Sequence, residues 1–217
     1  MTPILLVLSS PSGGGKTTIA RRLLAERTNV GYSVSATTRA KRPGETDGRD
    51  YHFLTREQFE SRVAAGEFLE WATYGGQLYG TLRSAVESLL KDGRHVVLDI
   101  EVDGAAQLRA SMPAGVQVFV LPPSVPVLLQ RLRGRGTEAT DAVVRRVRHA
   151  ADELQAIGAY DYVIVNDDLD RAVAAVLAIL DAETQRIHRH VELVGRVDGW
   201  RQELLDAAAS LAADHHA

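Results

Sequence analysis

A glycine-rich stretch near the start of the chain, SSPSGGGKTT at residues 9–18, has the composition of a loop that binds phosphate. It follows an apolar run at residues 4–8 and leads into a helical pattern. Successive glycines let several backbone N–H groups point at one anion, and the helix after them adds the positive end of its dipole. Lys16 would reach the β- and γ-phosphates of ATP, and the Thr17 hydroxyl would hold Mg²⁺. The predicted ATP-binding loop consists of Ser10, Pro11, Ser12, Gly13, Gly14, Gly15, Lys16, Thr17 and Thr18.

The loop departs from the pattern G-x-x-x-x-G-K-[ST] at its first position, where Ser10 stands in place of glycine. The alternative is a Gly/Ser linker that happens to contain a lysine, but a linker needs neither the strand before it nor the helix after it. Of the 25 basic residues, only Lys16, Lys41 and Lys91 are lysines. One of these three stands where a compact, flexible ammonium is useful, which favours the phosphate-binding interpretation.

Short apolar runs alternate with helical patterns along the rest of the chain. The runs at residues 4–8, 96–100, 116–121 and 162–165 predict buried strands, which is typical of a parallel sheet flanked by helices. Residues 32–81 break this alternation. They contain a Pro43-Gly44 turn, an Asp47-Gly48 hairpin signal and one short helix near residues 56–65. We therefore expect an α/β core with an inserted α+β lobe.

The second half of the chain is mainly helical by pattern. An arginine-rich helical stretch covers about residues 125–157, and residues 169–191 and 199–213 predict further helices with Gly195 and Gly199 between them. The last segment has an apolar stripe at spacings of three and four. We expect this stripe to pack on the chain's own core; a homodimer contact or a mostly disordered tail are the alternatives. The stripe consists of Trp200, Leu204, Leu205, Ala208 and Leu211.

Length and composition limit the classes of protein that this chain can be. With 217 residues and 45% apolar content, it can build one domain of moderate size with a real core. The net charge of −3 argues against a protein that coats nucleic acid, and the absence of cysteine excludes disulfides and thiolate metal sites. We recognise no signal peptide and no apolar run of ~18 residues, so we expect a soluble protein of the cytoplasm with no membrane partner.

Six segments, in order along residues 3–181, resemble the guanylate kinase family: SSPSGGGKTT, SVSATTRAKRPGETDGRDYHF, EFLEWATYGGQLYGT, VVLDIEVDGA, LRGRGTE and VIVNDDLD. The resemblance implies phosphoryl transfer from ATP to GMP, giving ADP and GDP. It also implies three parts: a core of residues 1–31, 82–124 and 158–181, a GMP-binding lobe of residues 32–81, and a mobile lid of residues 125–157. Residues 182–217 would form a helical C-terminal extension beyond the resemblance.

Selection of guanine requires particular side chains. Guanine has N–H donors at N1 and N2 and an acceptor at O6, so its pocket needs a carboxylate and a hydroxyl or N–H donor. A carboxylate finds no matching donors on adenine, and a buried unpaired charge costs on the order of several kcal/mol. The alternative for Glu70 is an ordinary surface charge. The resemblance implies that the guanine pocket contains Ser35, Glu70, Thr81 and Glu101.

The GMP phosphate requires cations, and the resemblance assigns this role to Arg39 and Arg42 with the hydroxyls of Tyr51 and Tyr79. Guanidinium groups bind phosphate bidentately. Because arginine makes up about a tenth of the chain, two arginines three residues apart can also be solvated charges by chance.

Transfer to an anionic phosphate oxygen needs no general base, so the site must supply in-line placement and positive charge. The resemblance implies that Lys16, Arg39, Arg135 and Arg146 are catalytic and that Arg131 binds ATP. The alternative for each lid arginine is a salt-bridged helix face.

Two polar residues follow predicted strands. Asp99 ends an apolar run, at the strand edge where open α/β sheets bind ligands; it would assist the Mg²⁺ shell through water or support the GMP site. Asn166, after the last strand, is a candidate adenine contact, although the Asn-Asp-Asp run can equally be a helix cap with Asp168 as the capping residue.

Three functions compete. We favour an ATP-dependent guanylate kinase that uses GMP and dGMP, acting as a monomer or homodimer without nucleic acid. Another small-molecule phosphotransferase on the same scaffold would keep the loop but change Glu70 or Thr81. A binding module similar to the guanylate-kinase-like domains of scaffold proteins typically lacks a working ATP loop, whereas here Gly13, Gly14, Gly15, Lys16 and Thr17 are intact.

Overall fold

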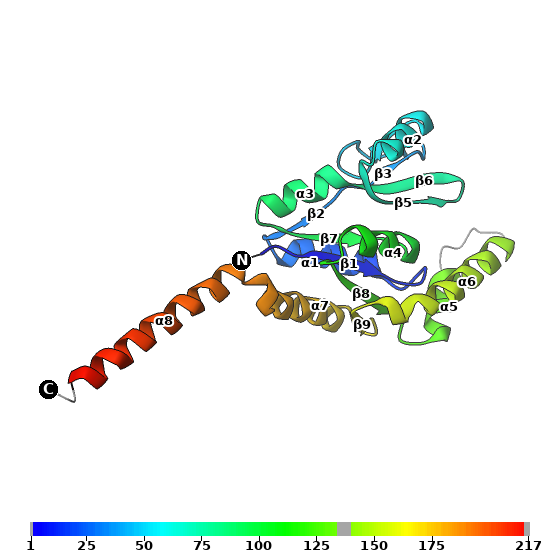
Figure 1. The fold of residues 1–217 in the computed structure, drawn as a ribbon. Coiled ribbons are helices and arrows are strands. Elements are labelled where there is room, and N and C mark those ends of the chain that lie inside the picture. Colours follow the sequence, from blue (N-terminus) through cyan, green and yellow to red (C-terminus); the bar gives the residue numbers. More distant parts are fainter. Residues whose placement is uncertain (1, 134–139, 215–217) are drawn as a thin grey trace.

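Five parallel strands form the central sheet, in the order β2-β7-β1-β8-β9 (Figure 1). The computed structural model describes residues 2–133 and 140–214. The four strands expected from apolar runs are confirmed to within one residue, whereas β2 was missed because three residues with a central glycine give no pattern. The strands are β1 (Leu5–Ser9), β2 (Val30–Tyr32), β7 (His95–Asp99), β8 (Val116–Leu121) and β9 (Tyr162–Val165).

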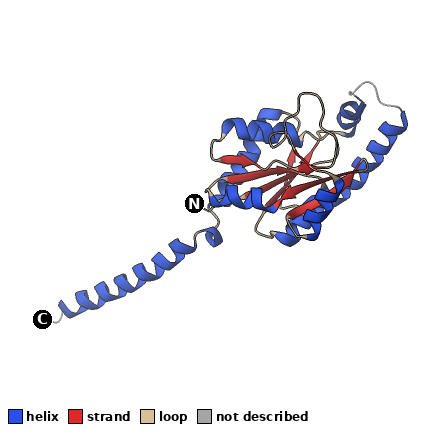
Figure 2. Cartoon of the chain, turned by 90° about the horizontal axis from the view of Figure 1, so that it is seen from above, coloured by secondary structure: helices blue, strands red, loops and turns tan. Residues whose placement is uncertain are grey.

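Helices cover both faces of this sheet, as Figure 2 shows from above. Helices α1 (Lys16–Glu26) and α7 (Leu169–Thr184) enclose the larger core on one face, where Leu6, Leu8 and Val118 are fully buried. Helices α3 (Arg83–Lys91) and α4 (Val102–Ser111) cover the other face over Val7 and Val96. The alternating apolar side chains of each central strand therefore enter two different cores, which keeps the carboxyl ends of β1 and β7 fixed side by side.

The inserted α+β lobe is confirmed. A second sheet has the order β4-β3-β6-β5, and α2 (Arg56–Ala64) packs on it through Phe59. The antiparallel hairpin of this lobe turns at Gly75 and Gly76, with φ of 57° and 77°, and not at Asp47-Gly48, because β3 and β4 pair in parallel. The lobe strands are β3 (Ala36–Thr37), β4 (His52–Phe53), β5 (Phe68–Tyr74) and β6 (Gln77–Leu82).

Two helices make up the described part of the expected lid. Helix α5 (Val125–Arg133) and helix α6 (Thr140–Leu154) pack through Leu128, Leu132 and Ala150. The 3₁₀ turn η1 (Gln155–Ala159) then leads into β9. The helical prediction for this region is confirmed over the described residues.

The C-terminal segment differs from expectation. Helix α7 ends at Thr184, the 3₁₀ turn η2 (Ile187–Arg189) follows, and α8 (Val191–Asp214) continues through both Gly195 and Gly199. The chain breaks its helical path at residues 185–190 and not at those glycines. Helix α8 extends away from the body (Figure 1), and residues 191–211 are all exposed, so the expectation that its apolar stripe packs on the chain's own core is wrong. Among the described residues, no helix is long and apolar enough to cross a membrane.

Candidate active site

The loop between β1 and α1 has the backbone shape of an anion cradle. Gly13 and Gly15 have φ of 86° and 99°, in the left-handed region that favours glycine. The N–H of Gly14 donates to the Pro11 carbonyl oxygen at 2.8 Å, which closes a tight turn. Ser10 does not have a positive φ, and its buried hydroxyl donates to the same carbonyl at 3.0 Å. Serine therefore fits the position at which the loop departs from the sequence pattern.

Two side chains from distant segments hold this loop in place. The Asn166 Nδ2 group donates to the Gly14 carbonyl oxygen at 2.9 Å, and Arg131 Nη1 donates to the same oxygen at 3.3 Å. Arg131 Nη2 also donates to the Asn166 carbonyl oxygen at 3.3 Å. A Cβ atom on Gly15 would collide with Asn166 Nδ2. Arg131 and Asn166, which were both predicted to bind ATP, thus lie at the loop. Their contact with ATP stays a prediction.

The helix-cap interpretation of the Asn-Asp-Asp run is confirmed for Asp168. Its Oδ1 accepts a hydrogen bond from the Arg171 N–H at 2.9 Å and caps α7. Asn166 and Asp168 therefore have separate roles within three residues: the first holds the loop and the second begins a helix.

Carboxylates from the end of β7 face the first turn of α1. Thr17 Oγ1 donates to Asp99 Oδ2 at 2.7 Å, and the Tyr32 hydroxyl donates to Asp99 Oδ1 at 2.7 Å. Lys16 Nζ lies 2.8 Å from Glu101 Oε1. These contacts arise because β1 and β7 are parallel neighbours whose carboxyl ends meet at one edge of the sheet. The adjacent oxygens of Thr17 and Asp99 are ligands of the type that Mg²⁺ prefers, so this pair fits the ion.

A third carboxyl group, that of Glu153 on α6, also reaches the loop. Its side chain is 1% exposed, and Oε2 accepts a hydrogen bond from the Ser12 N–H at 2.9 Å. Burial, together with the neighbouring Glu101 carboxyl, raises the pKa of Glu153 to about 8. Burial works against ionisation of Glu101 too, but the Lys16 ammonium lowers the pKa of that carboxyl. Glu153 therefore holds a proton at neutral pH beside an ionised Glu101 that is paired with Lys16.

Glu70 on β5 is a buried carboxylate, and the alternative that it is a surface charge is wrong. It is 6% exposed, and its Oε1 accepts a hydrogen bond from Thr81 Oγ1 at 2.6 Å across the β5–β6 pair. Burial raises the pKa of Glu70. Gly104 on α4 lies against this carboxylate, because a Cβ atom there would stand 2.5 Å from Glu70 Oε2. The lobe and the core thus meet around one buried acceptor group.

A cluster of cationic and aromatic side chains lies in the same lobe. The Arg39 guanidinium is 5.3 Å from the centre of the Tyr51 ring, and the Tyr51 and Tyr79 rings meet edge to face at 6.1 Å. Arg39 Nη2 is 2.7 Å from Glu45 Oε1, and Glu45 Oε2 accepts a hydrogen bond from the Arg42 N–H at 2.8 Å. Three of the four predicted phosphate-binding side chains therefore gather around an oriented guanidinium, and the fourth, Arg42, follows in the same loop.

The remaining predicted residues are more scattered. Ser35 is half-buried before β3, and its carbonyl oxygen accepts a hydrogen bond from the His52 N–H at 2.9 Å. Thr18 lies exposed in the first turn of α1. Arg146 Nη1 donates to the Leu132 carbonyl oxygen at 3.1 Å and so connects α6 to α5. Arg135 lies outside the described residues.

Sequence reasoning missed three residues that shape the site: Tyr32, Glu45 and Glu153. Glu45 had a usable signal, because an acidic residue that closely follows two predicted phosphate-binding arginines can pair with one of them. Tyr32 and Glu153 had none, since their partners are 67 residues away at Asp99 and 141 residues away at Ser12.

Comparisons with known proteins match most of the chain to one family. A family model described as guanylate kinase matches residues 2–183. The guanylate kinase of Symbiobacterium thermophilum is 51% identical over 187 residues, covering 86% of this chain and 89% of that protein. The guanylate kinase of Maricaulis maris is 46% identical over 205 residues, covering 94% and 90%. A crystal structure of guanylate kinase from Anaplasma phagocytophilum superposes with a TM-score of 0.75 at 36% identity, covering 91% of this chain and 95% of that one.

Proposed function

The chain belongs to the guanylate kinase family, and we propose that it transfers the γ-phosphoryl group of ATP to GMP, giving ADP and GDP. We extend the proposal to dGMP as acceptor, because no residue of the site is assigned to the 2′-hydroxyl. We also propose that the reaction recycles GMP in purine nucleotide metabolism and that the protein acts in the cytoplasm.

The ATP phosphates would bind at the loop of residues 10–18. Its N–H groups and the amino end of α1 supply partial positive charge, and Lys16 adds a full charge. Lys16 pairs with Glu101, and the ATP phosphates would compete with this carboxylate for the ammonium. Arg131 and Asn166 keep the loop in shape by binding the Gly14 carbonyl oxygen.

Thr17 would coordinate Mg²⁺ directly, and Asp99 would hold a water of its shell. When bound with ATP, the ion neutralises charge on the β- and γ-phosphates. The Tyr32 hydroxyl keeps the Asp99 carboxylate turned toward Thr17.

GMP would bind between the lobe and the core. Glu70 would accept the N1 and N2 protons of guanine, while Thr81 fixes the orientation of that carboxylate. Glu101 and Ser35 complete the predicted pocket. Arg39, oriented by Glu45 and Tyr51, would hold the GMP phosphate together with Arg42 and Tyr79 of the same lobe.

The chemistry requires alignment and charge, because the attacking oxygen of GMP is already anionic. Lys16 and Arg39 would stand on the two sides of the transferred group, and Arg135 and Arg146 would approach from the lid. Closure would also exclude water, which competes with GMP for the activated phosphoryl group.

The observation that carries the proposal is the buried Glu70 carboxylate, which accepts a hydrogen bond from Thr81. The same chain also contains the phosphate-binding loop. A phosphotransferase for a different acceptor has no use for a buried acceptor group at this place. A coupled ADP-release assay with GMP, dGMP, AMP, CMP and UMP tests it. We expect turnover with GMP and dGMP and a loss of orders of magnitude with the other three; equal turnover with AMP would contradict the proposal.

A further inference from the structure

Helix α8 presents a continuous apolar face to solvent. It is 24 residues long, and the exposed fractions of Trp200, Leu204 and Leu211 are 48%, 72% and 71%. Its axis leaves the body near the amino terminus of the chain, and no other described helix or strand lies beside it in Figures 1 and 2. A helix of this length spans about 36 Å, which is enough for a substantial contact.

Six of its apolar positions follow the repeat of a coiled coil, while Val194 and Leu205, which are also exposed, lie off this repeat. The spacing of the six alternates strictly between four and three residues, which keeps one seam on one side of two supercoiled helices. A shallow groove lined by Val197, Trp200, Arg201, Leu204 and Leu205 lies on this side. The six positions of the seam are Leu193, Val197, Trp200, Leu204, Ala207 and Leu211.

The helix is poorly suited to stand alone in water. Gly195 and Gly199 lie in its interior, and each lowers the stability of a helix by about 1 kcal/mol relative to alanine. Both glycines lie opposite the seam, and nothing within 4 Å would contact a side chain at either position. Most of the stability of a helix in a protein comes from packing of its apolar face, so we expect packing of the seam to stabilise α8.

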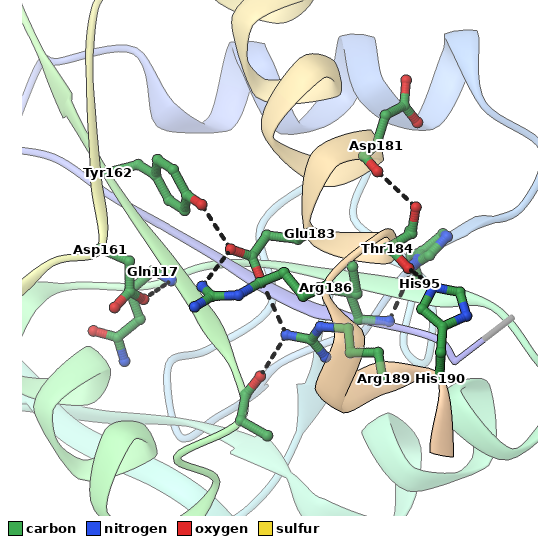
Figure 3. Close-up of polar contacts among 12 residues, drawn as sticks. His95, Gln117, Asp161, Tyr162, Asp181, Glu183, Thr184, Arg186, Arg189 and His190 are labelled. Carbon is green, nitrogen blue, oxygen red and sulfur yellow. Dashed lines mark hydrogen bonds and ion pairs between the residues drawn. The ribbon is translucent and has the colours of Figure 1, made fainter. Parts of the chain in front are cut away.

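The base of α8 is firmly attached to the body. Figure 3 shows the buried Glu183 carboxylate at the centre of the contacts that hold the turn before α8. It accepts hydrogen bonds from the Tyr162 hydroxyl at 2.6 Å, from Arg186 at 3.0 Å and from Arg189 at 3.3 Å. Arg189 also donates to the Ala114 carbonyl oxygen at 3.2 Å. The seam is therefore presented in a defined direction.

Charges beside the seam select the partner and its direction. On one flank of the seam lie Arg196 and Glu203, and on the other lies Arg201. In a parallel pair, Arg196 of each copy would lie beside Arg201 of the other, so like charges would meet on both sides. In an antiparallel pair with Val197 opposite Trp200, Arg196 of each copy lies beside Glu203 of the other. The helix is thus complementary to itself in one direction and register.

We propose that α8 is a dimerisation helix that packs antiparallel against α8 of a second copy of this chain, with Val197 opposite Trp200 and Arg196 paired with Glu203. Leu193 then lies opposite Leu204, which gives four apolar layers. A two-fold axis relates the copies, so the contact closes and does not extend into a filament.

Charge exchange in the full-length chain tests the pairing by sedimentation velocity. We expect the wild type to be a dimer, and we expect Arg196→Glu and Glu203→Arg each to raise the dimer Kd at least tenfold. The double variant Arg196→Glu/Glu203→Arg should recover the wild-type Kd within threefold. Asp198→Arg, a charge reversal away from the seam, is the matched control and should change Kd less than threefold. Unchanged GMP turnover in every variant verifies folding.

A monomeric wild type at tens of micromolar would overturn the proposal. So would tighter association of Arg196→Glu, which a parallel pair predicts, or a double variant that fails to recover.

Disulfide trapping tests the register independently, since the chain contains no cysteine. Leu193→Cys and Leu204→Cys should form a cross-linked dimer when mixed and oxidised, because these positions face each other. Each variant alone should stay unlinked, since its two copies of the cysteine are about 16 Å apart along the helices. A disulfide in Leu204→Cys alone would mean that the helices are parallel.

Discussion

The proposed ATP side of the active site, the loop of residues 10–18, and the proposed GMP side, the inserted lobe, are built from different chemistry. On the ATP side, the decisive groups belong to the backbone: the conformations of Gly13 and Gly15, and the Gly14 carbonyl oxygen held by Asn166. On the GMP side, they are side chains whose charges are buried or paired, such as Glu70 with Thr81 and Arg39 with Glu45.

This difference has a consequence for selectivity. A backbone cradle recognises phosphate, which all nucleoside triphosphates share, and it depends on shape. A buried carboxylate recognises one edge of one base, and it depends on the hydrogen bonds that the ligand returns. The acceptor should therefore be chosen strictly and the donor less so, and substitutions on the two sides should change different kinetic constants.

The largest expected effect separates the two sides outright. Lys16→Ala should lower kcat by ~10³-fold, because it removes the one lysine charge that stabilises the transferred phosphoryl group. The affinity for GMP should change by no more than about threefold, because Lys16 touches the predicted guanine pocket only at Glu101 and Glu70 keeps its own partner, Thr81. Calorimetric titration with GMP measures this, and circular dichroism verifies the fold. A folded variant that no longer binds GMP would show that the two sites are not separate.

The next effect belongs to the acceptor side alone. Glu70→Gln replaces an acceptor by a donor against the guanine N–H groups, which costs about 2–4 kcal/mol of transition-state stabilisation. We expect kcat/KM for GMP to fall ~10²-fold while KM for ATP is unchanged. Steady-state kinetics with each substrate varied in turn measures both constants.

Glu60→Gln is the matched control for this experiment, because Glu60 is an exposed glutamate on α2 of the same lobe. It should leave both constants unchanged. GMP turnover of Glu70→Gln within twofold of the wild type would remove Glu70 from the guanine pocket.

The sequence predicted the features of the fold and the site that have local signals, and it did not predict those that depend on contacts between distant residues. The core strands and the loop were predictable because their signals are local: an apolar run, a cluster of glycines and a lysine. The burial of Glu70 was not visible in its neighbours and rested on family resemblance. Glu153 could not be found, since its contact with Ser12 depends on how α6 packs and its sequence neighbours form an ordinary amphipathic helix.

The C-terminal segment illustrates the opposite error. The glycines at 195 and 199 suggested a break, yet α8 continues through both, and the break lies after α7, where Glu183 binds Arg186 and Arg189. These contacts set the place of the break, and a single sequence does not display them.

A smaller effect tests the dependence of the ATP side on backbone shape. Gly15→Ala adds a Cβ at φ 99°, where it also meets Asn166, so we expect KM for ATP to rise about tenfold or more. Gly93→Ala is the control: its φ is 77°, but nothing lies within 4 Å of the added atom. Gly93→Ala should lose about 1–2 kcal/mol of stability and keep its KM for ATP. Equal KM values for ATP in the two variants would mean that the backbone shape at residue 15 does not govern ATP binding.

The smallest effect concerns Glu153, which joins α6 to the ATP side. Its pKa of about 8 in the folded protein lies above the ordinary 4.5, so the folded state binds more protons than the unfolded state between these pH values. The stabilisation from this proton is complete below about pH 4.5 and is lost as the pH rises through about 8.

Glu153→Gln keeps a neutral side chain at every pH. The Tm of the wild type should therefore fall relative to the variant between pH 6 and pH 9 by a few degrees, which corresponds to about 1 kcal/mol for a chain of this size. Parallel melting curves across this range, with Glu60→Gln as control, measure the difference; a constant difference in Tm would mean that Glu153 is ionised throughout and that α6 binds the Ser12 N–H as an anion.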